Sequence, residues 1–168
     1  MPFLSGDRSA PAIAGWFDHD LASRNFAATP RLLRDQAADS TTVDGPAFWI
    51  QLKSSCCAIH ILEGTVTAVI GEPRDQDMQA LTAADVACMA AKSSVGENDI
   101  PHWDQLRGRF AIVHINLAQN AATLITDRFG VFPLCYLVEG SRIAFSDRAD
   151  SIQHQGAREI DLQAIFNY

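Results

Sequence analysis

The sequence predicts a mixed α+β domain, and three observations support this fold class. Apolar segments rich in β-branched residues follow one another closely in the first half, as strands of a sheet do. A segment with helical periodicity comes next, and two hairpin patterns complete the second half. At 168 residues one domain with a sizeable core is expected. We assign residues 1–11 to a loose arm and residues 12–168 to the domain.

One strand and one helix are expected in the first quarter of the chain. Residues 13–17 read I-A-G-W-F, a run typical of a short buried strand. Thr29 and Pro30 precede R-L-L, and a Thr cap with Pro in the first turn predicts that a helix begins there. Residues 39–46 read D-S-T-T-V-D-G-P, which indicates a polar loop.

Three strands and a helix are expected in the middle of the chain. The three apolar segments at residues 47–52, 58–62 and 66–71 predict the strands. The pair E-G at residues 63–64 predicts the turn between the last two strands. Apolar residues recur at helical spacing from residue 81 to residue 92, so this segment predicts a mostly buried helix.

Two β-hairpins are expected in the second half, after a helical turn at residues 101–106. The second hairpin turns through a two-residue loop that begins with Gly140, which suits the II′ type. Gly130 lies between the hairpins and is expected to have a positive φ. A final helix, capped by Asp161, ends the chain. The hairpin strands are expected at residues 108–116, 121–126, 133–139 and 142–146.

Three motifs in the second half carry a family resemblance. Residues 106–111 read L-R-G-R-F-A, residues 126–136 read T-D-R-F-G-V-F-P-L-C-Y, and residues 144–146 read A-F-S. Their order resembles the glutaminase domain of the asparagine synthetase family, with its L-x-G-x-F-A, R-D-x-F-G-x-x-P-L-Y-Y and F-A/S-S motifs. Thr126 and Cys135 depart from that pattern. The resemblance implies an N-terminal-nucleophile fold, a four-layer αββα sandwich with two antiparallel sheets between helical layers.

Pro11 occupies the position of the family's catalytic cysteine. The family opens C-G-I-A-G-x-F, and residues 12–17 align with it from the second position on. In such enzymes the free α-amino group is the base for the cysteine thiol, which attacks the glutamine carboxamide. Pro11 has no thiol, and its nitrogen lies in an internal peptide bond. The resemblance therefore implies an inactive glutaminase with no catalytic residue. An alternative is an amidohydrolase in which N-terminal processing exposes Ser5 or Ser9.

The glutamine pocket of the family is also only partly matched. Residues 70–75 read I-G-E-P-R-D where the family reads N-G-E-I-Y-N, so Gly71 and Glu72 are the candidate substrate-binding residues. Ile70 replaces the asparagine that helps to form the oxyanion site, and loss of one such donor costs about 100- to 1000-fold in rate. Ala83 replaces the aspartate that holds the glutamine amine. The arginine loop R-G-P-D is not recognisable.

Other polar clusters favour structural roles. Asp18, His19 and Asp20 alternate along the chain and cannot converge on one metal ion. His60 and His114 are expected on the sheet face away from the main core, or as hydrogen-bonded inner histidines. Asp127 and Arg128 are neighbours in the chain and are expected to form an ion pair. In the family this pair holds a turn. No glycine spacing suits a nucleotide, so this domain is expected to bind no cofactor and no metal.

Composition and cysteine spacing exclude several other classes. A net charge of -7 without clustered basic residues argues against a nucleic-acid surface. No apolar stretch approaches the roughly 18 residues of a membrane span, and no secretory signal opens the chain, so a cytoplasmic protein is expected. The four cysteines are expected to be buried small apolar residues without disulfides or zinc. They are Cys56, Cys57, Cys88 and Cys135.

The resemblance favours the N-terminal part of a two-domain, ATP-dependent amide-forming enzyme. ATP and Mg are then expected only in a synthetase domain that follows Tyr168, or in a separate synthetase chain. Relatives that close a ring with an internal amine, the lasso-peptide macrolactam synthetases and β-lactam synthetases, need no glutaminase. The synthetase domain or chain would bind the peptide or small-molecule substrate. A homodimer of this chain is a second possible assembly. The alternative is a stand-alone binding or scaffold protein with the same fold.

Overall fold

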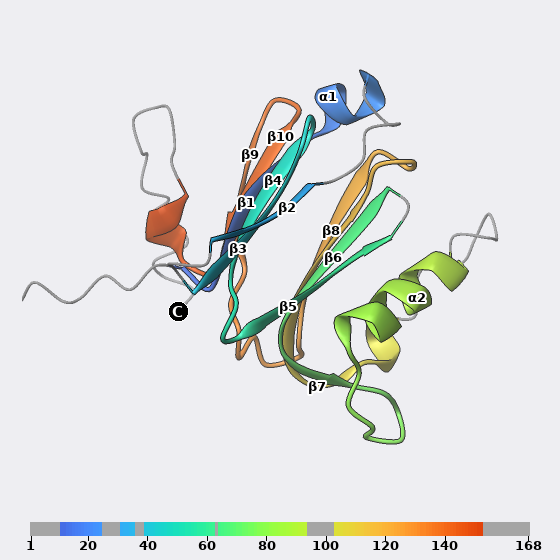
Figure 1. Cartoon of the computed structure of the whole chain (residues 1–168). Coiled ribbons are helices and arrows are strands. Elements are labelled where there is room, and N and C mark those ends of the chain that lie inside the picture. Colours follow the sequence, from blue (N-terminus) through green and yellow to red (C-terminus); the bar gives the residue numbers. More distant parts are fainter. Residues whose placement is uncertain (1–10, 25–30, 36–38, 63, 94–102, 153–168) are drawn as a thin grey trace, which may run out of the picture.

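Two antiparallel β-sheets packed face to face form the centre of the protein (Figure 1). The computed structural model describes residues 11–24, 31–35, 39–62, 64–93 and 103–152. The six-stranded sheet contains, in spatial order, β2 (Arg31–Asp35), β3 (Ser40–Gly45), β4 (Phe48–Lys53), β1 (Ile13–Asp18), β10 (Arg142–Ser146) and β9 (Cys135–Glu139). The four-stranded sheet contains β5 (Cys57–Leu62), β6 (Thr65–Arg74), β7 (Arg107–Asn116) and β8 (Ala121–Thr126).

The helices are short, and one of them covers the four-stranded sheet. α2 (Ala83–Ser93) packs on the outer face of that sheet, against β5 and β6 (Figure 1). α1 (His19–Arg24) continues directly from β1 and lies at one end of the six-stranded sheet. The α+β class and the two stacked antiparallel sheets are thus confirmed, with α2 as a helical layer. The remaining elements are two 3-10 turns, η1 (Trp103–Gln105) and η2 (Ala149–Ser151).

The main core lies between the two sheets and follows the period of two expected of strands. In β1, Ile13 and Phe17 point inward and are buried, while Trp16 between them is only half-buried. In β7, by contrast, every residue from Phe110 to Asn116 is buried. Both faces of β7 are covered, one by the six-stranded sheet and the other by α2 and η1. No described helix is long and apolar enough to cross a membrane.

Two expectations for the first third of the chain are wrong. Residues 31–35 form strand β2 instead of a helix, and residues 40–45 form strand β3 instead of a loop. β2 pairs with β3, and β3 pairs with β4, so cross-strand hydrogen bonds override the local helix-start signal. In β3 the buried Thr41 and Val43 alternate with half-buried neighbours, which is the pattern of a strand packed on a core.

The other predicted elements within the described residues are confirmed. The strands of the two hairpins pair as expected, and Gly130 and Gly140 both have a φ of 60°. In the Gly140 turn Ser141 does not share the positive φ, in agreement with the II′ type. Ten of the eleven residues of the expected arm, 1–10, lie outside the described residues, as do the caps at Thr29 and Asp161, Glu63 of the turn and the final helix.

Of the histidines that the structure describes, only His114 is buried, and it lies on the α2 side of the four-stranded sheet. Its Nδ1 lies 2.9 Å from Oγ1 of Thr67, its partner in the β6–β7 register, and Trp103 packs beside its ring. Burial lowers the pKa of His114 below its ordinary value of 6.5. The side chain is therefore a hydrogen-bonded structural histidine, neutral in the folded protein.

We expect the free energy of unfolding to fall as the pH is lowered below 6.5, in part because of His114. Below that value the unfolded state binds a proton that the folded state still excludes, so stability decreases with decreasing pH. Chemical unfolding of the wild type and of His114→Gln, measured between about pH 5 and pH 8, tests this contribution. The variant should have a smaller pH dependence over this range. An unchanged dependence would contradict the assignment.

Candidate functional site

The start of β1, where the family places its nucleophile, is held by a carboxylate. Oδ2 and Oδ1 of Asp147 accept hydrogen bonds from the backbone N–H groups of Ala12 and Ile13, each at 3.1 Å. The Ser146 hydroxyl donates to the carbonyl oxygen of Ile13 at 3.0 Å. Pro11, immediately before these residues, is half-buried. On the other side of the strand, the Lys53 N–H donates to the carbonyl oxygen of Ala12 at 2.8 Å, so bonds on both sides fix the chain directly after Pro11.

A cysteine that sequence reasoning treated as core lies beside this position. Sγ of Cys57 donates to the carbonyl oxygen of Ala12 at 3.1 Å. The two sulfur atoms of Cys56 and Cys57 are 3.7 Å apart. Burial, together with the neighbouring Cys56, raises the pKa of the Cys57 thiol to about 12. At neutral pH it is therefore protonated and a weak nucleophile. The expectation of buried cysteines is wrong for Cys56 and Cys88, which are exposed free thiols, and the free thiols of Cys57 and Cys135 are only half-buried.

We expect Cys57 to react with iodoacetamide at least about tenfold more slowly than Cys56 and Cys88, because alkylation requires the thiolate. The rates are measured by quenching, proteolysis and tandem mass spectrometry, which separates the adjacent cysteines. In denaturant all four cysteines should react at similar rates. Alkylation of Cys57 as fast as that of Cys56 in the folded protein would show that its thiol is not protected.

Gly71 and Glu72 line a hollow of about 420 Å³ at the ends of β6 and β7. Glu72 is exposed, and its Oε2 forms an ion pair of 3.4 Å with the guanidinium of Arg74. A second nitrogen of Arg74 donates to the carbonyl oxygen of Met78 at 2.8 Å. The two matched pocket residues, which are neighbours in the chain, thus both line this hollow. The full lining is Gly71, Glu72, Arg74, Met78, Gly108, Arg109 and Phe132.

Gly71 is required here by close packing. A Cβ atom on Gly71 would lie 2.3 Å from the carbonyl oxygen of Arg109 and 2.5 Å from Cε2 of Phe132, and its φ is +81°. Phe132 comes from the F-G-V-F-P turn, so this contact joins the G-E motif to the turn motif far along the chain. The glycine therefore has a packing reason independent of any ligand.

The other pocket positions of the family do not converge on this hollow. Ile70 points into the core between the sheets and is 1% exposed. Ala83 is the first residue of α2 and is buried in a separate apolar cluster. Thr82 and Asp85 flank Ala83 in a reciprocal pair: the Thr82 N–H donates to the Asp85 carboxylate and the Asp85 N–H to the Thr82 hydroxyl, at 2.8 and 3.2 Å. The family match at residues 82–85 thus corresponds to a helix cap.

Asp127 organises the turn between the two hairpins. Its buried carboxylate accepts the N–H groups of Phe129, Val131 and Phe110 at 2.8, 3.1 and 3.2 Å. The turn-holding role is confirmed, but the expected ion pair with Arg128 is wrong. In the described part of the chain no basic side chain lies within 4.0 Å of the Asp127 carboxylate. Backbone amides satisfy it instead.

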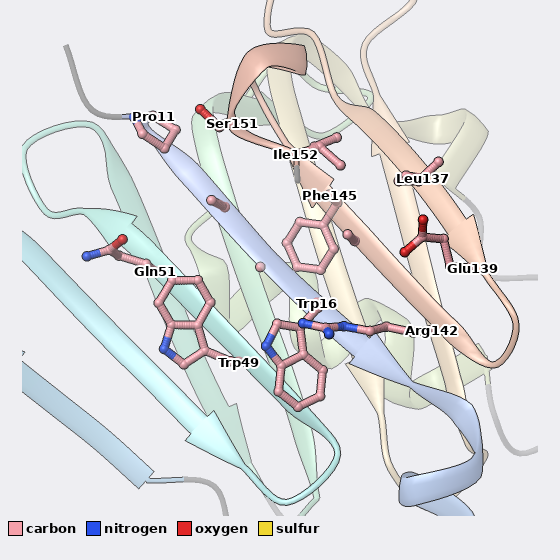
Figure 2. A pocket seen from close by; sticks show the side chains of 13 residues that line it. Pro11, Trp16, Trp49, Gln51, Leu137, Glu139, Arg142, Phe145, Ser151 and Ile152 are labelled. Carbon is pink, nitrogen blue, oxygen red and sulfur yellow. The ribbon is translucent and has the colours of Figure 1, made fainter. Parts of the chain in front are cut away.

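A second hollow, of about 450 Å³, lies on the outer face of the six-stranded sheet (Figure 2). Trp16 and Trp49 are partners in the β1–β4 register and lie side by side on its floor. The guanidinium of Arg142 is 4.6 Å from the centre of the Trp16 ring, a cation–π contact. Pro11 and Ser151 also line this hollow (Figure 2). Pro11 and the Gly71–Glu72 pair therefore line different hollows.

Sequence reasoning did not find the tryptophan hollow. The available signal was the outward position of Trp16, between two inward-facing residues of its strand. The pairing of Trp16 with Trp49 depends on strand register, which no local signal specifies.

Within the described residues, no group of three or more His, Cys, Asp or Glu side chains could hold a metal ion.

A family model described as a glutamine amidotransferase domain matches residues 69–154. The match begins in β6, just before Gly71 and Glu72, and extends through the Asp127 turn to η2. It covers just over half of the chain and includes all three motifs of the second half. No curated protein sequence matches the chain.

Proposed function

Because the chain belongs to the glutamine amidotransferase domain family, we propose that it is a glutaminase-like domain that does not hydrolyse glutamine. The observation that carries this proposal is Pro11, two residues before β1, an internal imino acid with neither a thiol nor a free amine. Ala12, the next residue, is tied to Asp147. Cys57, the nearest thiol to this strand start, is protonated at neutral pH.

The loss of the oxyanion donor supports the same conclusion. Ile70 stands where the family has an asparagine, and its buried side chain contributes to the inter-sheet core. An asparagine at this position would have to bury an amide among apolar side chains, at a cost of about 1–3 kcal/mol. An alkyl side chain at this position therefore stabilises the inter-sheet core, and the donor that catalysis needs is lost.

We place this domain in an asparagine-synthetase-like enzyme that forms amides with ATP. ATP and Mg would bind to a synthetase domain or partner chain, and a ring-closing reaction with an internal amine, as in lasso-peptide or β-lactam formation, needs no released ammonia. The domain would then have a structural role or contribute to the substrate interface. The tryptophan hollow supports an interface role, since paired indoles beside an arginine are typical contact residues.

A glutaminase assay on the full chain tests the proposed inactivity. With L-glutamine as substrate, we expect neither glutamate nor ammonia above the buffer control. A second sample lacks residues 1–10 and carries Pro11→Cys, so that a cysteine becomes the first residue. We expect it to remain at least about 100-fold below an active glutaminase because Ile70 offers no oxyanion donor. Ammonia release by the wild type, with a mass showing cleavage before Ser5 or Ser9, would support the processed amidohydrolase instead.

The synthetase association has its own test. A synthetase domain with the pyrophosphate motif S-G-G-x-D-S should be encoded after Tyr168 or in a neighbouring reading frame. If the synthetase is encoded in a neighbouring reading frame, co-expression of the two chains should give a complex that is stable in size-exclusion chromatography. The two open hollows also favour a stand-alone binding or scaffold protein. A chain with no such reading frame and no such complex would support that second candidate, or a homodimer if it elutes as one.

A further inference from the structure

Among the described residues, the Gly71–Glu72 hollow contains one arginine that forms no ion pair. Glu72 pairs with Arg74, and Arg74 also donates to the Met78 carbonyl. Arg109 is exposed and makes no ion pair or side-chain hydrogen bond with another described residue. The lining therefore has two arginines and one glutamate, in a chain with a net charge of -7. A local positive charge on an acidic protein attracts anions.

The fold fixes the place of Arg109 with respect to its neighbours. Glu72 and Arg109 are partners in the β6–β7 register, so their Cβ atoms lie about 5 Å apart. The two strands approach closely here because Gly71 and Gly108 have no side chains: a Cβ on either would lie 2.3 Å from a backbone oxygen of the other strand. The arginine is thus carried on a strand rather than on a loop, at the edge of the hollow.

Apolar surface adjoins this cation. Phe132 packs over Gly71 and is half-buried, and Met78 is 55% exposed. Met78 has a φ of 64°, an uncommon value for a residue with a side chain. Its turn is held by Asp75, which accepts the Gln79 N–H at 2.8 Å and also receives the Met78 N–H at its own carbonyl. Met78 and Phe132 thus supply the apolar part of the lining of the hollow.

We infer that this hollow binds a carboxylate that carries an apolar group, with Arg109 as the residue that recognises the anion. The planar guanidinium offers paired N–H donors that match the two oxygens of a carboxylate. Phe132 and Met78 would contact the apolar part. Two sources share this chemistry, an N-acylated amino acid and the C-terminus of a peptide. The inference does not depend on the lost glutaminase activity.

The test measures binding of two acids and of their amides to the full chain by isothermal titration calorimetry. The acids are N-acetyl-L-phenylalanine and a tripeptide that ends in phenylalanine, and each amide differs from its acid only in the lost charge. We expect each acid that binds to do so at least about tenfold more tightly than its amide. The tighter of the two acids identifies the source.

Arg109→Gln should weaken binding of the acid at least about tenfold. Arg107→Gln is the matched control, because it removes the same charge from the same strand. Arg107 donates to the carbonyl oxygens of Asp104 and Leu106, at 2.7 and 3.1 Å, and does not line the hollow. This control should bind like the wild type. Circular dichroism melts establish that both variants are folded.

Three results would overturn the inference. The first is binding of neither acid at about 10 mM. The second is equal affinity for acid and amide. The third is an Arg109→Gln variant that binds as well as the wild type, or one that binds no worse than Arg107→Gln when both are weakened, which would indicate a general charge effect. None of these results bears on the ammonia assay, so failure here is distinguishable from failure of the proposed function.

Discussion

Replacement of Asp127 by alanine is expected to lower the free energy of unfolding by about 3 kcal/mol. Its carboxylate accepts three backbone N–H groups, those of Phe110, Phe129 and Val131, at 3.2, 2.8 and 3.1 Å. Alanine leaves these donors without an acceptor at a position that is 5% exposed. A buried donor without a partner costs about 1–3 kcal/mol, and partial hydration of the turn reduces the sum.

The measurement is urea unfolding, with the m value used to check that the transition remains two-state. Asp127→Asn keeps one oxygen acceptor and should lose less stability than Asp127→Ala. Asp77→Ala is the surface control, since the exposed Asp77 side chain makes no hydrogen bond or ion pair with another described residue, and it should change stability by less than about 0.5 kcal/mol. An Asp127→Ala protein as stable as this control would refute the role of the carboxylate.

The second large effect is expected for Gly15→Ala, which should cost about 3 kcal/mol or prevent folding. Gly15 is in the middle of β1, paired with Ile50 on one side and Phe145 on the other. A Cβ atom would lie 2.5 Å from the carbonyl oxygen of Trp49 and 2.6 Å from Cζ of Phe145. The carbonyl belongs to a paired strand, and the ring is fully buried, so neither can move away without repacking the core.

Two further variants separate overpacking from a general effect of removing glycine. Gly64→Ala meets open space but has a φ of +78°, so backbone strain alone should cost about 1 kcal/mol. In a double-mutant cycle, Phe145→Leu removes the ring atoms nearest to the new methyl group. The cost of Gly15→Ala should then be smaller than in the wild-type background. A Gly15→Ala protein within about 1 kcal/mol of the wild type would contradict the packing argument.

The strands that sequence reasoning predicted correctly have strong local signals. β1, β5 and β7 combine β-branched or aromatic residues with clear boundaries, and the β9–β10 hairpin has Gly140 at the position that its turn requires. β2 and β3 were missed because their strand state depends on pairing with β4. Such pairing is a tertiary interaction and can override a helix-start signal like that of Thr29 and Pro30.

The sequence by itself determined that no thiol and no free amine stand at Pro11, because side-chain chemistry and chain position are read directly from it. It also identified Gly71 and Glu72 as neighbours in one motif. Only the tertiary structure placed Pro11 in a different hollow from that pair and put Arg109 beside Glu72. Strand register decides both placements, and register is set by the burial of whole sheet faces rather than by the residues of any one segment.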